Sequence, residues 1–159
     1  MPATATPRRP AMRRHPQPPQ PPPGQPPPAS LALGAVPTAP ACARAWTRAI
    51  LAEWRLAGLE DVSELIVSEL ASNAMAACRR EGMPCFWLTL TLGSDGLAIL
   101  VRDFCAGIPR VREAAWEDED GRGLQLVAAM SGQSGWYPAR DGLPGKVVYA
   151  VLPTSGAAS

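Results

Sequence analysis

The stretch LEDVSELIVSELASNAMAACRREG, residues 59–82, carries the strongest structural signal in the sequence and predicts one long helix. Asp61 and Glu64 have the spacing of a capping box at the start of a helix. Two arginines near the other end suit the negative end of the helix dipole, and Gly82 suits the position just after the last turn. We therefore expect a helix over about residues 61–81.

Glu69 and Asn73 interrupt the apolar character of this predicted helix. Side chains four residues apart lie one above the other on a helix, so the carboxylate and the amide share one edge. Burying either group without a partner would cost about 1–3 kcal/mol, so both must face water or a ligand. A solvated helix edge is the simpler interpretation of the pair taken alone, and the ligand interpretation depends on motifs elsewhere in the chain.

The rest of the chain predicts further elements on either side of that helix. Apolar residues at helical spacing predict a first helix, and alternating apolar residues predict two hairpins. The expected elements are a helix over residues 41–58, strands over 85–92, 97–103, 134–140 and 145–152, a loop over 104–120 and a short helix over 121–132. Helices segregated from a mostly antiparallel sheet form an α+β fold. We expect a two-layer sandwich in which helices cover one face of a mixed, mostly antiparallel sheet.

The two ends of the chain differ from this central part in composition. Residues 1–30 hold 12 of the 19 prolines and four arginines, but no acidic residue. A segment with so few large apolar residues cannot offset the entropy of ordering itself, so we expect residues 1–39 to form a disordered, partly polyproline II tail. The sequence thus predicts one ordered domain over residues 40–153 and a short disordered end over residues 154–159.

Charge and apolar patterning disfavour several classes of function. Without the four arginines of the tail, 11 basic and 14 acidic residues remain, a formal charge of −3, and no basic stripe is present to bind nucleic acid. No run of about 18 apolar residues indicates a membrane span, and the basic N-terminus lacks the apolar core of a secretory signal. We expect a cytoplasmic protein whose four cysteines stay reduced and partly buried.

Three further motifs place chemistry-bearing residues at the ends of elements. Asp103 ends a strand and precedes Gly107, so a carboxylate and a permissive backbone position lie together, although capping of a turn is the simpler interpretation of the aspartate alone. Residues 121–123, Gly-Arg-Gly, lead into a helix, where free N–H groups attract phosphate and Arg122 adds a forked cation, although most such glycine pairs are turns. Lys146 begins the last strand, where a solvated edge charge is simpler than a ligand.

In chain order these motifs read ELxxNA, VxDxxxGxP, GRGLxLV and GKxVxAxL. This order resembles the Bergerat-fold (GHKL, histidine-kinase-like) ATP-binding family, which includes histidine kinases, gyrase and mismatch-repair ATPases. Within that family the sequence is most similar to the stand-alone branch of anti-sigma-factor serine kinases and related actinobacterial ATP-binding regulators. The resemblance covers roughly residues 40–153, and the sequence departs from the family pattern at residues 76–78, at Cys105 and at Trp136-Tyr137.

The resemblance assigns a role to each motif residue. It implies that the amide oxygen of Asn73 ligates a Mg²⁺ ion that bridges the phosphates of ATP, since this hard cation prefers oxygen ligands. It implies that Glu69 is the general base that accepts a proton from the attacking hydroxyl or water. Asp103 matches the aspartate that binds the adenine amino group, and Gly107 matches the glycine beside the ring. The residues that match the turn around the phosphates are Gly121, Arg122 and Gly123.

These roles imply a serine/threonine protein kinase of the anti-sigma-factor type. It would transfer the γ-phosphoryl group of Mg·ATP to a serine of a small antagonist protein, with a sigma factor as a second binding partner and a homodimer as the assembly found in many relatives. A histidine kinase is disfavoured, because the only histidine, His15, lies in the predicted tail. Two alternatives stay open: a nucleotide-dependent protein-interaction module without significant phosphotransfer, and an α+β protein that binds no nucleotide.

Overall fold

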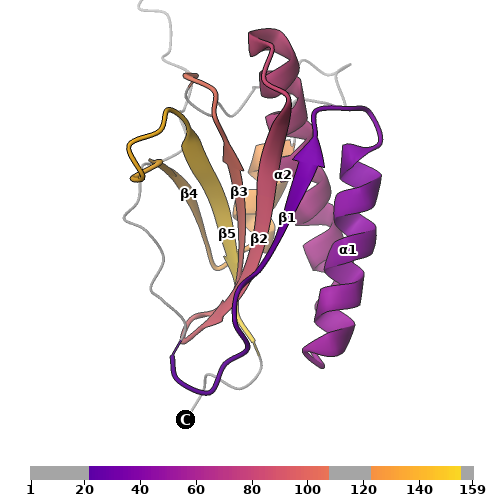
Figure 1. Cartoon of the computed structure of the whole chain (residues 1–159). Helices are drawn as coiled ribbons and strands as arrows, with labels where there is room; N and C mark the ends of the chain where they lie inside the picture. Colours follow the sequence, from indigo (N-terminus) through magenta and orange to yellow (C-terminus); the bar gives the residue numbers. More distant parts are fainter. Residues whose placement is uncertain (1–21, 108–122, 155–159) are drawn as a thin grey trace, which may run out of the picture.

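Five strands and three helices make up the described part of the chain. The computed structural model describes residues 22–107 and 123–154 (Figure 1). The helices are α1 (Ala39–Glu53), α2 (Glu60–Glu81) and α3 (Gly123–Met130). The strands are β1 (Ala29–Gly34), β2 (Cys85–Gly93), β3 (Gly96–Asp103), β4 (Gln133–Pro138) and β5 (Lys146–Leu152). They form one antiparallel sheet with the strand order β1-β2-β3-β5-β4.

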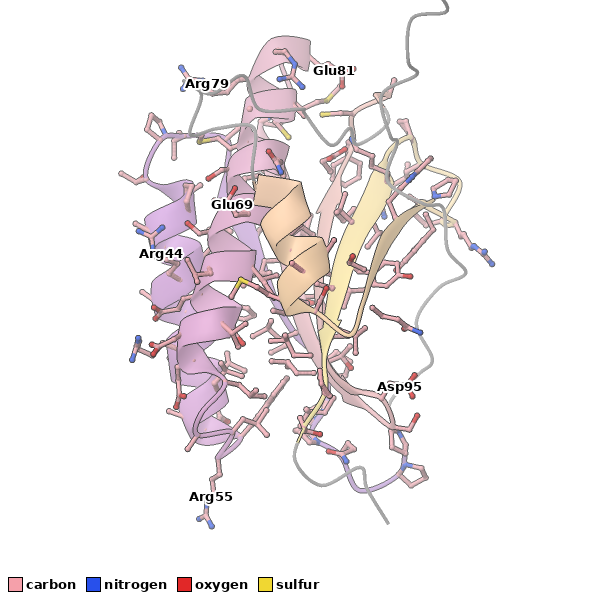
Figure 2. The ribbon with its side chains drawn as sticks, turned by 180° about the vertical axis from the view of Figure 1, so that it is seen from behind. Arg44, Arg55, Glu69, Arg79, Glu81 and Asp95 are labelled. Atoms are coloured by element: carbon pink, nitrogen blue, oxygen red, sulfur yellow. The ribbon has the colours of Figure 1, made fainter. Side chains whose placement is uncertain are left out.

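The helices cover one face of this sheet and bury the main core. In Figure 1 α1 lies beside β1, and α2 and α3 lie behind the sheet; Figure 2 shows the helices from their own side. Phe86, Leu88 and Leu90 alternate along β2 and are fully buried, in one cluster with Ile66 and Leu70 of α2. Every second residue of the strand therefore faces the helices. The predicted α+β two-layer sandwich with helices on one face is confirmed.

The helix α2 confirms the prediction for residues 61–81, but it begins without a capping box. Leu59 occupies the N-cap position and makes no side-chain cap bond, so Asp61 lies inside the first turn. Glu64 instead accepts a hydrogen bond from Arg48 Nε on α1, at 2.6 Å. Both groups of this hydrogen bond are charged, whereas a backbone N–H would offer Glu64 only a neutral donor. The predicted capping box is therefore wrong.

Left-handed backbone sets the ends of α1 and α2. Gly82, with a φ of +70°, ends α2 as predicted. The helix α1 ends at Glu53, well before the predicted end at Gly58. Arg55 has a φ of +55°, a region in which a right-handed helix cannot continue, so the chain leaves the helix there. Gly58, with a φ of +94°, lies in the turn that leads into α2 instead.

The strand β1 lies inside the segment that composition assigns to a disordered tail, and for residues 29–39 that prediction is wrong. β1 pairs antiparallel with β2 over its whole length, and Leu33 faces the core with 6% of its surface exposed. This strand is short and follows three prolines, so the alternation of its apolar residues is a weak signal in the sequence. Pairing with β2 stabilises the strand. Residues 22–28 and Thr154, also predicted to be disordered, are described and form neither helix nor strand, and residues 1–21 and 155–159 lie outside the described residues.

The remaining predicted elements agree with the structure as far as it describes them. The two hairpins are confirmed as β2–β3 and β4–β5. The helix α3 lies within the predicted range of 121–132, and the predicted loop over 104–120 is described only up to Gly107. Among the described residues, none of the helices combines the length and the apolar character that crossing a membrane requires.

Candidate functional site

A buried ion pair joins the ends of two neighbouring strands. Asp103 ends β3, Lys146 begins β5, and the two residues are register partners. Lys146 Nζ lies 3.0 Å from Asp103 Oδ1 and 3.0 Å from Asp103 Oδ2, and the lysine and the aspartate are only 6% and 2% exposed. The expectation that Lys146 is a solvated edge charge is therefore wrong. Its position opposite Asp103 gives the ammonium group a charged partner, which a buried cation needs.

The backbone around Asp103 holds its carboxylate in one orientation. The N–H of Cys105 donates to Asp103 Oδ1 at 2.9 Å, so the aspartate also caps the turn that follows it. Gly145 has a φ of +120°, and a Cβ at this position would overlap the backbone oxygen of Asp103. Only glycine lets the start of β5 approach the end of β3 so closely. This approach brings Lys146 to the carboxylate.

The loop after β3 is attached to the C-terminal end of α2. The N–H of Ala106 lies 3.1 Å and 3.3 Å from the two carboxylate oxygens of Glu81. The Sγ atoms of Cys105 and Cys78 lie 3.8 Å apart, and burial raises the pKa of both thiols. Both thiols therefore stay protonated near neutral pH and serve as small buried apolar groups. These contacts fix the loop that carries Asp103 against α2.

Glu69 and Asn73 lie on α2 before this attachment. Asn73 is exposed and Glu69 is partly buried. At about 1.5 Å of rise per residue, the backbone of Asn73 lies roughly 7–8 Å along the helix axis from that of Cys78. The helix α3 packs against α2, and Figure 2 shows Glu69 at the level of the first turn of α3. The two polar residues therefore lie on the helix that contacts both α3 and the loop after β3.

Two contacts from α1 hold this part of α2 in place. Arg44 Nη1 donates to Ser68 Oγ at 2.8 Å, directly before Glu69 in the chain. One turn earlier on α2, Glu64 accepts the hydrogen bond from Arg48, which lowers the pKa of the carboxyl and raises that of the guanidinium. Contacts with α1 thus fix the part of α2 that carries the predicted site residues.

The remaining predicted site residues are described only in part. Gly107 is exposed, and a Cβ there would meet no atom of the described residues within 4 Å. Gly123 is the first residue of α3. Gly121 and Arg122, predicted to surround the phosphates, lie outside the described residues. The part of the site that the structure brings together consists of α2, the loop after β3 and the start of α3.

The donor groups of this site suit a Mg²⁺ ion bound together with a nucleotide better than a metal ion held by protein side chains alone. No group of three or more His, Cys, Asp or Glu side chains that could hold a metal ion occurs among residues 22–107 and 123–154. A Mg²⁺ ion bound with a nucleotide needs fewer protein ligands, since phosphates and water supply the other oxygens. The exposed amide of Asn73 fits such a donor set. The four cysteines are all free, as predicted, although Cys42 is exposed rather than partly buried.

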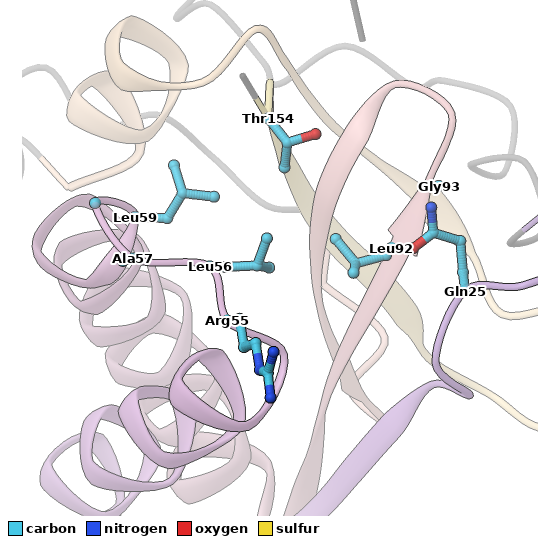
Figure 3. A pocket seen from close by; sticks show the side chains of 9 residues that line it. Gln25, Arg55, Leu56, Ala57, Leu59, Leu92, Gly93 and Thr154 are labelled. Carbon is cyan, nitrogen blue, oxygen red and sulfur yellow. The ribbon is translucent and has the colours of Figure 1, made fainter. Parts of the chain in front are cut away.

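A separate hollow of about 450 Å³ lies at the opposite end of α2 (Figure 3). It is lined by Gln25, Arg55, Leu56, Ala57, Gly58, Leu59, Leu92, Gly93 and Thr154. Of the residues predicted to bind a nucleotide, none of those that the structure describes lines this hollow. It is therefore a feature of the fold distinct from the site around Asp103.

The fold and the site together define an α+β protein in which one helix edge and one strand end present polar groups beside a buried Asp103–Lys146 pair. No protein-family model matches the chain, and no curated protein matches it. Sequence reasoning missed Lys146 as the partner of Asp103 and Glu81 as the acceptor for the loop. These contacts join residues 43 and 25 positions apart, and the only local signal was the Gly-Lys pair that begins β5.

Proposed function

We propose that the chain is an ATP-binding regulatory protein that acts as a serine/threonine protein kinase of the anti-sigma-factor type. Mg·ATP would bind beside α2, between the loop after β3 and the start of α3. The observation that supports this most is the fixed carboxylate of Asp103. It is paired with Lys146, and its loop is attached to the helix that carries Glu69 and Asn73.

The surroundings of Asp103 support adenine as the base. An ionised carboxylate offers about four acceptor positions. Lys146 Nζ donates to Oδ1 and lies 3.0 Å from Oδ2, and the N–H of Cys105 also donates to Oδ1. The position left on Oδ2 suits an exocyclic amine, which donates, whereas the carbonyl oxygen of guanine would meet the carboxylate as a second acceptor. A Cβ at Gly107 would meet no atom of residues 22–107 and 123–154 within 4 Å, which supports a flat ring at this place.

Asn73 and Glu69 support the phosphate end of the proposed site. Asn73 would hold Mg²⁺, which when bound neutralises phosphate charge, and the N–H groups around Gly123 at the start of α3 would bind phosphate oxygens. Glu69 lies four residues from Asn73 on the same edge of α2. From there its carboxylate would accept the proton of the attacking serine hydroxyl.

The partners follow from the same motif order. The phosphoryl acceptor in this proposal is a serine of a small antagonist protein, and a sigma factor is a second binding partner. A cytoplasmic location and a homodimeric assembly belong to the same proposal. They rest on the resemblance over residues 40–153.

Phosphotransfer with three variants tests the proposal. The protein is incubated with Mg²⁺, candidate antagonist proteins and ATP labelled in the γ-phosphoryl group. Glu69→Gln should retain ATP affinity and lose transfer by at least about 100-fold, the usual effect of a general base. Asn73→Ala should lose Mg²⁺-dependent ATP affinity while it keeps its fold, because the side chain is exposed. The neighbouring Ser72→Ala is the matched control and should change neither property.

The outcomes separate the alternatives. ATP binding without transfer to any antagonist would identify a nucleotide-dependent interaction module in place of a kinase. Unchanged Mg²⁺-dependent affinity in Asn73→Ala would contradict the proposed ligand of the metal. A calorimetric titration that detects no ATP binding to the wild type would reject the nucleotide site altogether.

A further inference from the structure

One half of the outer face of the sheet is apolar and buried, although no described helix covers it. A second apolar cluster on this face consists of Ala98, Tyr137, Val147, Tyr149 and Val151. The exposed fraction is 3% for Tyr149 and 5% for Tyr137, and none of the five exceeds 9%. The two tyrosine rings lie 6.0 Å apart at an interplanar angle of 43°. We call these five residues the tyrosine cluster.

The strand pattern places the tyrosine cluster opposite the helices. Val148 and Ala150 of β5 belong to the main core, so the residues that alternate with them point to the outer face. On the same face Trp87 of β2 alternates with Phe86 and Leu88 of the core, and it is 42% exposed. Where nothing covers the outer face, as at Trp87, a large side chain is therefore exposed to solvent. The low exposure of the tyrosine cluster indicates that something covers it.

The chain before β1 turns back just where the described residues begin. Gln25 N–H donates to the backbone oxygen of Pro22 at 3.3 Å, and Gly24 has a φ of +91°. Proline at the second position and glycine with positive φ at the third are the pattern of a type II turn, here Pro22-Pro23-Gly24-Gln25. Such a turn reverses the chain direction.

This turn lies at the end of β5 that is nearest to Val151. Gln25 lines the same hollow as Thr154, which follows the end of β5 at Leu152 (Figure 3). A polyproline II chain rises about 3.1 Å per residue and a strand about 3.4 Å per residue, so roughly eight residues of tail span the length of β5. The stretch PQPPQP, residues 16–21, is close enough to the turn to reach both tyrosines.

We propose that the N-terminal tail, residues 1–21 of this chain, folds back over the outer face of the sheet, with residues 16–21 packed on Tyr137 and Tyr149. A polyproline II segment suits this face because it has no internal hydrogen bonds and needs no ladder with a neighbouring strand. Aromatic side chains are the usual surface for such segments, whose preformed shape loses little entropy on docking. The tail is then part of the folded unit, not a linker.

The phenol groups agree with a covered face. Burial raises the pKa of Tyr149, and burial together with the neighbouring Tyr149 raises the pKa of Tyr137. The chain contains only these two tyrosines, so any measurement specific for tyrosine reports on the tyrosine cluster alone.

Photo-crosslinking in the full-length chain tests the contact directly. Gln20 is replaced by p-benzoylphenylalanine, and the crosslinked peptides are mapped after irradiation. Crosslinks within one chain to β4 or β5 support the proposal. The same replacement at Gln25 is the matched control and should give crosslinks to the hollow around Leu92 and Thr154. Crosslinks confined to the helical side, or their absence at Gln20, would overturn the proposal.

Fluorine NMR of 3-fluorotyrosine in the full-length chain gives a second readout. Serine at positions 16, 18, 19 and 21 removes the prolines from the docking stretch, and we expect paramagnetic broadening of both tyrosine signals by a soluble gadolinium chelate to rise severalfold. Serine at positions 8, 9, 13 and 14 removes the arginines and keeps every proline, so this control should leave the broadening unchanged. Equal broadening in the wild type and the proline variant would contradict the proposal. Protection that disappears on dilution of the wild type would also contradict it and would identify a second copy of the chain as the cover.

Discussion

Lys146 and Asp103 illustrate, at the scale of single residues, how two buried charges depend on each other. Lys146→Met removes the cation and leaves a carboxylate that is 2% exposed with the N–H of Cys105 as its remaining donor in the described structure. An uncompensated buried charge is costly, so we expect the free energy of unfolding at pH 7 to fall by about 3–5 kcal/mol. Urea denaturation followed by tryptophan fluorescence measures this change.

The double variant Asp103→Asn/Lys146→Met is the control for that prediction. It buries no charge, and the methionine fills much of the lysine's volume, so it should recover most of the stability that the single variant loses. Equal losses in the single and double variants would show that volume, not charge, determines the effect.

At the scale of secondary-structure elements, the close approach of β3 and β5 depends on one glycine. Gly145 and Gly142 both have positive φ, +120° and +78°, but only a Cβ at Gly145 would overlap the backbone of Asp103. We expect Gly142→Ala to cost about 1 kcal/mol, from backbone strain alone. Gly145→Ala should cost about 3 kcal/mol or more, since strain and overlap act together. Thermal unfolding of the two variants compares these costs, and similar values for both would contradict the prediction.

The elements also show which parts of the fold a single sequence can reveal. The helix α2 and the two hairpins follow from local periodicity, because each carries its own pattern and its own end signals. The strand β1 exists through pairing with β2, and no local pattern records such pairing. The same limit applies to the site: Asp103 is recognisable as a strand-end carboxylate, but its partner Lys146 depends on the register between strands far apart in the chain.

At the scale of the whole molecule, buried thiols and phenols should make the free energy of unfolding fall as the pH rises into the alkaline range. Burial raises the pKa values of Cys78, Cys105, Tyr137 and Tyr149 in the folded state. Above the ordinary pKa of each group the unfolded chain has lost the proton that the folded chain keeps, so unfolding releases protons and stability falls as pH rises. The contribution of each group is complete below its ordinary pKa, near 8.5 for thiols and near 10 for phenols, and is lost progressively above it.

Urea unfolding between pH 6 and pH 11, at constant ionic strength and with a reductant, checks this dependence. Near pH 6.5 these four groups should add no slope, whereas from about pH 8 the thiols should begin to lower the free energy of unfolding, and from about pH 10 the phenols should steepen the fall. The variant Cys78→Ala/Cys105→Ala should be less stable at every pH because of the cavities left, but with a smaller slope between pH 8.5 and 10. Cys42→Ser changes an exposed thiol and should keep the slope of the wild type. A slope that is the same in all three proteins would place the source of the alkaline sensitivity outside the contact between α2 and the loop after β3.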